Sequence, residues 1–267
     1  MALTIDEQLE AGDLDGAIEA LNQAVRNNPT DTARRSALAE LLCFAGNFER
    51  ADRLLDAVQH QDVTVAVGVA LFRQLIRAEE ARQAFYAECR LPEFLSPPDD
   101  HDQLYLRALV ALKDNNRTEA AALLSDAEAK RAPLPGRLDG AAFDDMRDLD
   151  DVAAAHLDVL TSTGKFFWVP LRSVESIILH KPERRRDLLW RRATLSVASG
   201  PDGEIFLPTI YPTVDKNRSA LSRLGRETDF IGGEGEPMRG IGLRSFIFGD
   251  EARSILEIAK VEFDIPR

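Results

Sequence analysis

The chain contains 267 residues, 45% of them hydrophobic and 29% charged, which is enough to form one large domain or two small ones with real cores. Its formal net charge of −12 disfavours nucleic acid as a partner, because an acidic chain is repelled by phosphate backbones. No apolar run approaches the roughly 18–20 residues that cross a bilayer, so we also expect no membrane partner.

The N-terminus and the cysteines indicate the compartment. Residues 1–7 lack the positive start and the apolar run of a signal peptide. Cys43 and Cys89 are the two cysteines, and both fall in helix-patterned segments, so a disulfide framework is not indicated. We therefore expect a soluble cytoplasmic protein.

The N-terminal half contains an internal repeat. The stretch AGDL at 11–14 recurs as AGNF at 45–48, at an offset of 34 residues. A degenerate third copy at 116–120 echoes residues 47–51 at an offset of 69. A period of 34 residues is typical of tetratricopeptide helix pairs. Stacked helix pairs present a concave face that usually holds a peptide or a helix.

Apolar spacing predicts the helices of this half. After a first stripe from Ala17 to Val25, Pro29 restarts the chain, with Thr30 or Asp31 as the expected N-cap. The remaining pattern gives stripes over 37–45 and 48–58, a long helix over roughly 62–90 and a helix pair over roughly 101–131. We predict a tetratricopeptide-like helical domain over residues 1–132.

An acidic run follows the helical half. Two prolines and a glycine within 132–136 end the last helix and favour an extended linker. The run from Asp144 to Asp151 then carries five carboxylates among eight residues. An EF-hand loop needs oxygen ligands at positions 1, 3 and 5, and Met146 or Val152 falls at one of them, depending on the register. We predict a linker and a solvated acidic connector over 133–150, with no metal site.

The hydrophobic period then changes to that of strands. Alternation around Thr161–Gly164 predicts a hairpin, with a helix over 151–160 as the alternative, and a short helix is expected over 171–178 after Pro170. Two clear strands, 189–197 and 204–207, flank a turn at Gly200–Gly203. Two more strands are expected at 246–248 and 256–263. We predict a small mixed α+β domain over 151–267, with mainly antiparallel pairing because the connections are too short for crossovers.

Catalytic and cofactor motifs are absent from the sequence. The glycine-rich stretch at 231–237 lacks the Gly-Lys-Ser/Thr ending of a phosphate-binding loop, and its two glutamates would repel phosphate. The histidines show no metal-ligand spacing, and no nucleophile elbow is present. We therefore expect no catalytic residue, no cofactor and no metal. The four histidines are His60, His101, His156 and His180.

A basic run stands out in this acidic chain. Residues 181–192 include six basic and two acidic side chains, so nucleic acid or lipid headgroups are conceivable partners, but pairing with the acidic connector is the favoured interpretation. Strand alternation places Trp190 on a polar face beside Arg192, where it is either capped by a helix of its own domain, the more common outcome, or available to a partner. The candidate partner-binding residues are Trp168, Arg184, Arg185, Arg186, Trp190 and Arg192.

The C-terminal half contains an ordered set of short motifs. They are, in chain order, FWVP at 167–170, RDLLW at 186–190, GEIFLP at 203–208, Tyr211, LGRETDF at 224–230 and GIG at 240–242. Together these motifs resemble the ImpE/TagJ family of type VI secretion accessory proteins, and the helical N-terminal half also fits that family. One departure is that family members tend to carry an arginine and a proline shortly after the acidic run, where this chain has Val152 and Ala153–Ala155.

The resemblance implies a cytoplasmic, non-enzymatic adaptor. Members of the family are associated with the small sheath subunit TssB, through an N-terminal helix of that subunit, and with the ClpV ATPase that recycles contracted sheath. A groove in this chain would then accept the apolar face of an amphipathic helix. The alternative is a binding or catalytic module for a small anionic ligand, which would use the basic surface around Arg184–Arg192.

Overall fold

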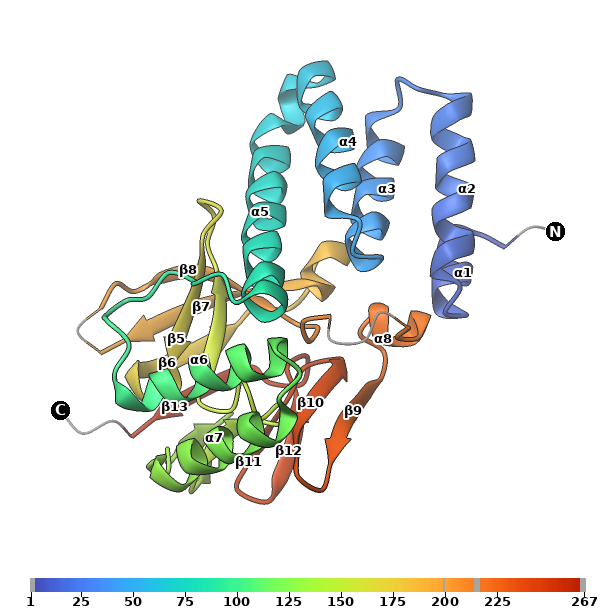
Figure 1. The fold of residues 1–267 in the computed structure, drawn as a ribbon. Helices are drawn as coiled ribbons and strands as arrows, with labels where there is room; N and C mark the ends of the chain where they lie inside the picture. Colours follow the sequence, from blue (N-terminus) through green and yellow to red (C-terminus); the bar gives the residue numbers. More distant parts are fainter. Residues whose placement is uncertain (1–2, 199, 214–216, 265–267) are drawn as a thin grey trace.

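The structure is a computed structural model, which describes residues 3–198, 200–213 and 217–264. It joins a helical N-terminal half to a mainly antiparallel β half, as the sequence predicts (Figure 1). None of the helices in the described ranges is both long and apolar enough to cross a membrane. The α-helices are α1 (Ile5–Glu10), α2 (Leu14–Asn27), α3 (Thr32–Phe44), α4 (Phe48–Gln61), α5 (Ala66–Glu88), α6 (Asp100–Lys113), α7 (Arg117–Lys130) and α8 (Ala220–Arg223).

The predicted repeat is a series of helix hairpins with matching caps. Asp13, Asn47 and Asn116 stand at the same place in the three copies, and each side chain accepts a hydrogen bond from the backbone three residues on. Asp31 caps α3, which confirms one of the two predicted positions. Gly46 takes a left-handed φ of 76° in the turn before α4, a conformation that glycine adopts without strain.

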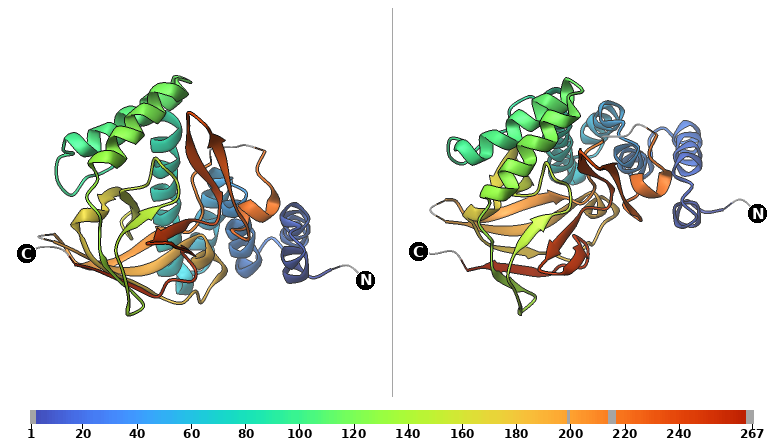
Figure 2. Two further views of the ribbon diagram at one scale, coloured as in Figure 1. Left: turned by 90° about the horizontal axis from the view of Figure 1, so that it is seen from below. Right: turned by 60° about the horizontal axis from the view of Figure 1, so that its bottom comes forward.

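The third copy of the repeat, α6 and α7, does not stack on the first two copies. Helices α1–α5 lie side by side, whereas α6 and α7 lie over the β half (Figures 1 and 2). The segment between α5 and α6 is held on the edge of the sheet, because the Glu93 N–H donates to Phe166 O at 2.9 Å and the Trp168 N–H donates to Glu93 O at 3.1 Å. The degenerate copy therefore keeps its hairpin but covers the sheet instead of extending the repeat.

The described part of the β half has an eight-stranded sheet in the order β2-β1-β13-β6-β7-β8-β4-β5, with antiparallel pairing throughout. A three-stranded sheet, β12-β11-β3, and the hairpin β9–β10 complete it. The strands are β1 (Gly136–Leu138), β2 (Ala141–Phe143), β3 (Met146–Asp148), β4 (His156–Leu160), β5 (Phe166–Pro170), β6 (Val174–Leu179), β7 (Trp190–Val197), β8 (Gly203–Pro208), β9 (Thr228–Gly233), β10 (Glu236–Gly242), β11 (Ser245–Phe248), β12 (Glu251–Ser254) and β13 (Lys260–Phe263).

Several local predictions are confirmed and others are corrected. The hairpin around Thr161–Gly164 is confirmed, and its helical alternative is excluded. Residues 133–150 carry β1–β3 rather than a linker, because their short strands pair with later segments of the chain. The helix expected over 171–178 is only a 3₁₀ turn, Leu171–Ser173, and β6 follows it as an interior strand between β13 and β7. The last strand is shorter than expected and begins at Lys260.

Both faces of the large sheet are covered. One face packs against the small sheet through a core that includes Ile177, Leu195 and Phe246. The other face packs against α5, and the core there runs without interruption from Leu9 in α1 to Leu224 after α8. The helical and β halves therefore share one hydrophobic interior.

Candidate partner-binding site

A buried ionic network fixes α5 on the sheet. The Arg82 guanidinium donates to Asp158 on β4 at 2.7 Å and to Glu79 at 2.9 Å. Arg244 donates to Asp148 at 2.5 Å and lies 3.3 Å from the carboxylate of Asp158. These side chains are at most 6% exposed. Desolvated pairs of this kind tolerate little displacement, so they set the position of α5 relative to β4.

The ionisation of the network follows from its geometry. Burial alone would raise the pKa of Asp158, but Arg244 and Arg82 lower it below the usual range. Burial raises the pKa of Asp148, although Arg244 opposes the shift. Burial and the Asp158 charge raise the pKa of the Tyr86 phenol well above its usual value, and its hydroxyl donates to Asp158 at 2.9 Å. The charged groups of the network thus neutralise one another.

The acidic run at 144–151 is not a solvated connector, and that prediction is wrong. Asp148 and Asp150 are 0% and 1% exposed. Nε of Arg239 donates to both carboxylate oxygens of Asp150 at 3.0 Å, and Arg244 pairs with Asp148. The neutralising arginines arrive from about 90 residues further along the chain, so the local sequence does not reveal them.

Two of the motifs that carry the family resemblance lie against each other. A Cβ atom at Gly240 would lie 2.3 Å from the ring of Tyr211, so only glycine allows the tyrosine to lie there. The Tyr211 hydroxyl donates to Asp148 and is 2.9 Å from its carboxylate, and the Ser245 N–H donates back to the hydroxyl oxygen at 3.1 Å. These motif residues therefore build the interior beside the buried network.

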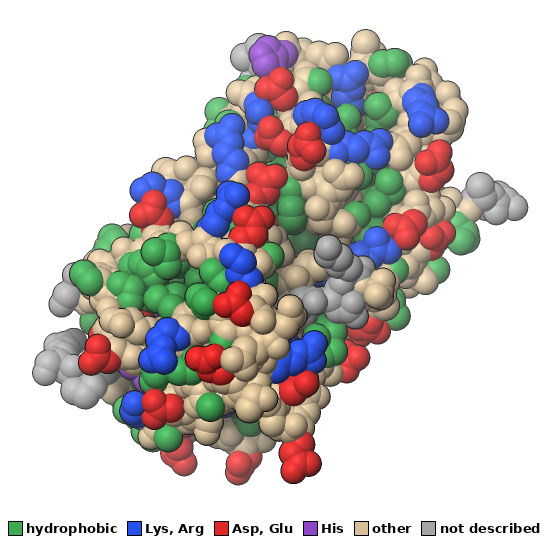
Figure 3. Space-filling view, viewed as in Figure 1, with side chains coloured by type: hydrophobic (Ala, Val, Ile, Leu, Met, Phe, Trp, Pro, Cys, Tyr) green, Lys and Arg blue, Asp and Glu red, His purple; other side chains and the backbone are tan. Residues whose placement is uncertain are grey.

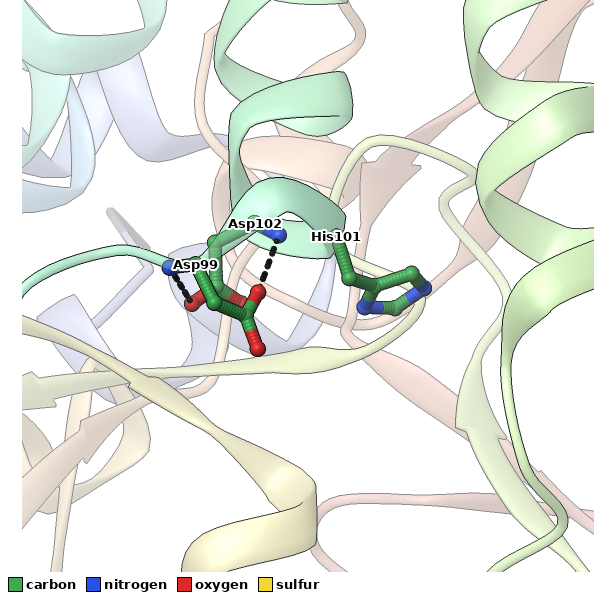
Figure 4. A group of neighbouring side chains, drawn as sticks. All are labelled: Asp99, His101 and Asp102. Carbon is green, nitrogen blue, oxygen red and sulfur yellow. Dashed lines mark hydrogen bonds between the residues drawn. The ribbon is translucent and has the colours of Figure 1, made fainter.

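A possible metal-binding cluster lies at the start of α6. Ligand atoms of Asp99, His101 and Asp102 lie within 4.8 Å of one another (Figure 4). The Arg172 guanidinium already neutralises the two carboxylates, with donor distances of 2.8 Å to Asp102 and 2.9 Å to Asp99. Asp102 also accepts from Nε2 of His156 at 2.9 Å. Since Asp99 and Asp102 form the capping box of α6, the cluster is explained as a helix cap paired with an arginine.

Both tryptophans are interior residues. Trp168 is 0% exposed and stacks on His156, with ring centroids 3.6 Å apart and planes inclined by 8°. Trp190 is 2% exposed, meets Phe72 edge to face at 5.9 Å, and donates from Nε1 to Glu79 at 3.1 Å. A helix therefore caps Trp190, but it is α5 of the N-terminal half and not a helix of the predicted α+β domain, as the sequence interpretation had it.

Two arginines of the basic run, Arg185 and Arg186, contact helices of the repeat. Arg185 pairs with Asp6 at 2.7 Å and lies 4.0 Å from Glu40 of α3. Arg186 places its guanidinium over the ring of Phe72 on α5, 5.3 Å from the centroid. Burial raises the pKa of Glu40, and the nearby arginines partly offset this effect. The 3₁₀ turn at Arg185–Leu188 thus fills the space between α3 and α5 where a tetratricopeptide groove would hold a ligand.

The other arginines of the run are also accounted for. Arg192 pairs with Glu204 on the neighbouring strand at 3.2 Å, and Arg191 donates to the backbone oxygens of His180 and Ile255. Arg184 is exposed, and its backbone N–H donates to the Asp187 carboxylate at 2.9 Å. The run therefore pairs with acids outside the acidic run, contrary to the favoured interpretation. Because these arginines are paired or lie on open surface, the described residues give no support to an anion pocket around Arg184–Arg192.

An open cleft of about 640 Å³ lies beside the turn between the end of α3 and the start of α4. We call it the repeat cleft. Ala45 and Phe48 form its apolar wall, at the turn between the two helices. Gln83 of α5, Arg218 and Arg223 line it from the other sides. A narrow inner extension reaches Glu79 and the edge of Trp190. The sequence does not reveal this site, because its walls come from three distant segments, none of which has a recognisable motif.

A second exposed feature is apolar. Figure 3 shows a broad apolar area on the left of the molecule, where the segment between α5 and α6 crosses the β half in Figure 1. Leu91 and Leu95 of this segment are 74% and 40% exposed. Exposed apolar patches often mark interaction surfaces.

Comparisons with known proteins agree with this architecture. The ImpE protein family matches residues 140–262, and a tetratricopeptide repeat matches residues 8–75. The chain is 29% identical over 265 residues to the type VI secretion system accessory component TagJ of Pseudomonas aeruginosa, covering 99% of this chain and 92% of that protein. A crystal structure of a protein from Vibrio parahaemolyticus has the same fold, with a TM-score of 0.92, 24% identity and 98% coverage of each chain. Residues 140–262 thus match the ImpE family, and the chain as a whole is similar to the accessory component TagJ.

Proposed function

We propose that this protein is a non-enzymatic, cytoplasmic adaptor of a type VI secretion system. In this proposal it binds an amphipathic helix at the N-terminus of the small sheath subunit TssB, and it thereby connects the sheath to ClpV-dependent recycling. The similarity to an accessory component named TagJ over 99% of the chain supports the assignment to this secretion system.

The observation that carries the docking proposal is the repeat cleft. Its apolar wall at Ala45 and Phe48 suits the apolar face of a helix, and its polar side at Gln83 and Arg218 suits the polar face.

The position of residues 185–188 also favours the repeat cleft as the docking site. Residues 185–188 lie between α3 and α5, so a helix from another protein would have to displace them to bind there. The repeat cleft is open without such a rearrangement. The commitment of the buried acids and arginines to one another supports an adaptor rather than an enzyme, because catalytic groups need access to a substrate.

The test is a titration of the full-length protein with a fluorescently labelled peptide from the N-terminus of the cognate TssB. We expect saturable binding at micromolar concentrations, competition by unlabelled peptide, and none with a scrambled peptide of equal composition. Absence of binding at high micromolar concentration would contradict the proposal. Addition of ClpV to the complex then tests the second connection, by co-sedimentation with and without this protein.

Two variants separate the repeat cleft from the basic run. Phe48→Asp places a charge on the apolar wall and should abolish binding of the peptide. Arg184→Ala and Arg192→Ala test the exposed arginines that remain candidate contacts on the β half. If the arginine variants lose binding while Phe48→Asp still binds, the peptide contacts the large sheet rather than the repeat cleft.

A further inference from the structure

The repeat cleft has a local charge opposite to that of the chain. Among its described lining residues are two arginines, Arg218 and Arg223, and no acid. The chain as a whole carries a net charge of −12. A cationic wall in an acidic protein therefore favours an anionic group on whatever enters the cleft.

The two arginines differ in how they are engaged. Arg223 donates to the carboxylate of Asp15 at 2.9 and 3.1 Å, so its charge is largely balanced. Among the described residues, none forms a hydrogen bond or an ion pair with the Arg218 guanidinium. Arg218 is half-buried, and burial lowers its pKa, although an arginine keeps its charge at physiological pH. Arg218 is thus the cation in the cleft with capacity for an incoming acid.

The carboxylate that attracts Arg218, that of Glu79, already accepts three hydrogen bonds. Glu79 attracts Arg218 electrostatically from the inner end of the cleft. However, Glu79 accepts from Arg82 at 2.9 Å, from Gln83 at 2.7 Å and from Trp190 at 3.1 Å. A carboxylate has about four acceptor positions, so three strong donors leave Glu79 little capacity for another guanidinium. A second carboxylate, supplied from outside, would complete the pairing of Arg218.

We propose that Arg218 selects the docked helix by pairing with an aspartate or glutamate side chain at the edge of its apolar face. This inference rests on the proposed function and names the recognition chemistry of the repeat cleft. An acidic side chain fits better than a chain terminus, because the apolar wall at Phe48 and the guanidinium line the same open cleft and match an apolar face bordered by an acid. The planar guanidinium also favours two-pronged recognition of a carboxylate.

The first experiment measures binding of the TssB peptide to Arg218 variants of the full-length protein. Arg218→Ala should weaken binding about 10- to 100-fold. Arg218→Lys should have a smaller effect, because lysine keeps the charge but cannot donate two parallel hydrogen bonds to one carboxylate. Arg253→Ala is the matched control, since Arg253 is a partly exposed arginine on β12 that pairs with Glu251. Thermal melts check that each variant is folded.

The second experiment identifies the acid on the peptide. Each aspartate or glutamate is changed in turn to its amide, and the C-terminus is prepared both free and amidated. One amide substitution should reproduce the loss seen with Arg218→Ala, and should cause no further loss in that variant. Dependence on the free C-terminus instead, or equal affinity of Arg218→Ala and the wild type, would overturn the inference and leave the proposed function intact.

The third experiment does not depend on the secretion partner. Glutarate is titrated into ¹⁵N-labelled protein, with neutral glutaramide as the control, and the Nε–H signal of Arg218 is assigned from its loss in Arg218→Lys. A saturable shift with glutarate alone supports a carboxylate site even if the TssB peptide does not bind. No shift with either compound, together with no effect of Arg218→Ala on the peptide, contradicts the inference.

Discussion

Arg82 and Asp158 form a buried ion pair at 2.7 Å across 76 residues of sequence. Each side chain is 1% exposed, and the pair joins α5 of the helical half to β4 of the large sheet. The helical and β halves are therefore connected by a polar contact as well as by a continuous apolar core.

The first prediction concerns this ion pair. Asp158→Ala should lower the free energy of unfolding by about 3–5 kcal/mol, because it leaves Arg82 and Arg244 buried without one of their two carboxylate partners. Urea denaturation followed by circular dichroism measures the change. The control is Glu49→Ala, which removes the exposed partner of Arg53 and should cost less than about 1 kcal/mol. Equal effects of the two variants would show that the buried pair does not stabilise the fold.

The second prediction concerns cooperativity. The proposed division into a helical domain at 1–132 and an α+β domain at 151–267 would allow two separate transitions. The shared interior instead leads us to expect one transition. Both tryptophans lie where helices meet the sheet, so their fluorescence reports the junction, while far-ultraviolet circular dichroism reports mainly the helices. Coincident midpoints are expected, and loss of the fluorescence signal at clearly lower denaturant would contradict the prediction.

The third prediction concerns acid stability. Burial alone would raise the pKa of Asp102, but hydrogen bonds from His156 and Arg172 lower it below the usual range. A carboxyl with a lowered folded-state pKa stabilises the protein above its unfolded value near 3.9, and this stabilisation is lost as the pH falls toward the folded value. Asp102→Asn should therefore reduce stability at pH 7 by about 1–3 kcal/mol and flatten the loss below pH 4.

Melting temperatures between pH 2.5 and 7 test this dependence. Asp126→Asn is the matched control, because Asp126 is half-exposed and pairs only with Lys130 of its own helix among the described residues. A pH profile of Asp102→Asn parallel to that of the wild type would exclude Asp102 as a source of the acid sensitivity.

The fourth prediction separates an interior role of Trp190 from a contact role. Trp190→Phe keeps most of the ring packing but removes the hydrogen bond to Glu79, so it should cost about 1–3 kcal/mol of stability. Binding of the TssB peptide should remain within about twofold of the wild type, because Trp190 is 2% exposed. Strongly weakened binding without a change in stability would instead assign Trp190 to the partner surface.

The elements that follow from short-range chemistry could be predicted from the sequence. The period of 34 residues and the equivalent caps at Asn47 and Asn116 establish the helix hairpins, because a cap needs only a side chain and the amides that follow it. The turn at Gly200–Gly203 likewise predicts the pairing of β7 with β8. The ordered motifs of the C-terminal half predicted a resemblance to the ImpE/TagJ family, which the comparisons confirm.

Residues close together in the chain specify the helix pairs, the hairpins and the motifs that resemble the ImpE/TagJ family. The burial of polar residues and the position of open surface depend instead on how distant segments pack in the tertiary structure. Asp148 lies in a run that is predicted to be solvated, but Arg244 pairs with it. Trp190 is predicted to be either capped within its own domain or available to a partner, but it lies under α5 of the helical half. Desolvated pairs and clefts form between segments far apart in sequence, so their composition depends on how faces meet. The repeat cleft, with Arg218 on its polar side, is the clearest example.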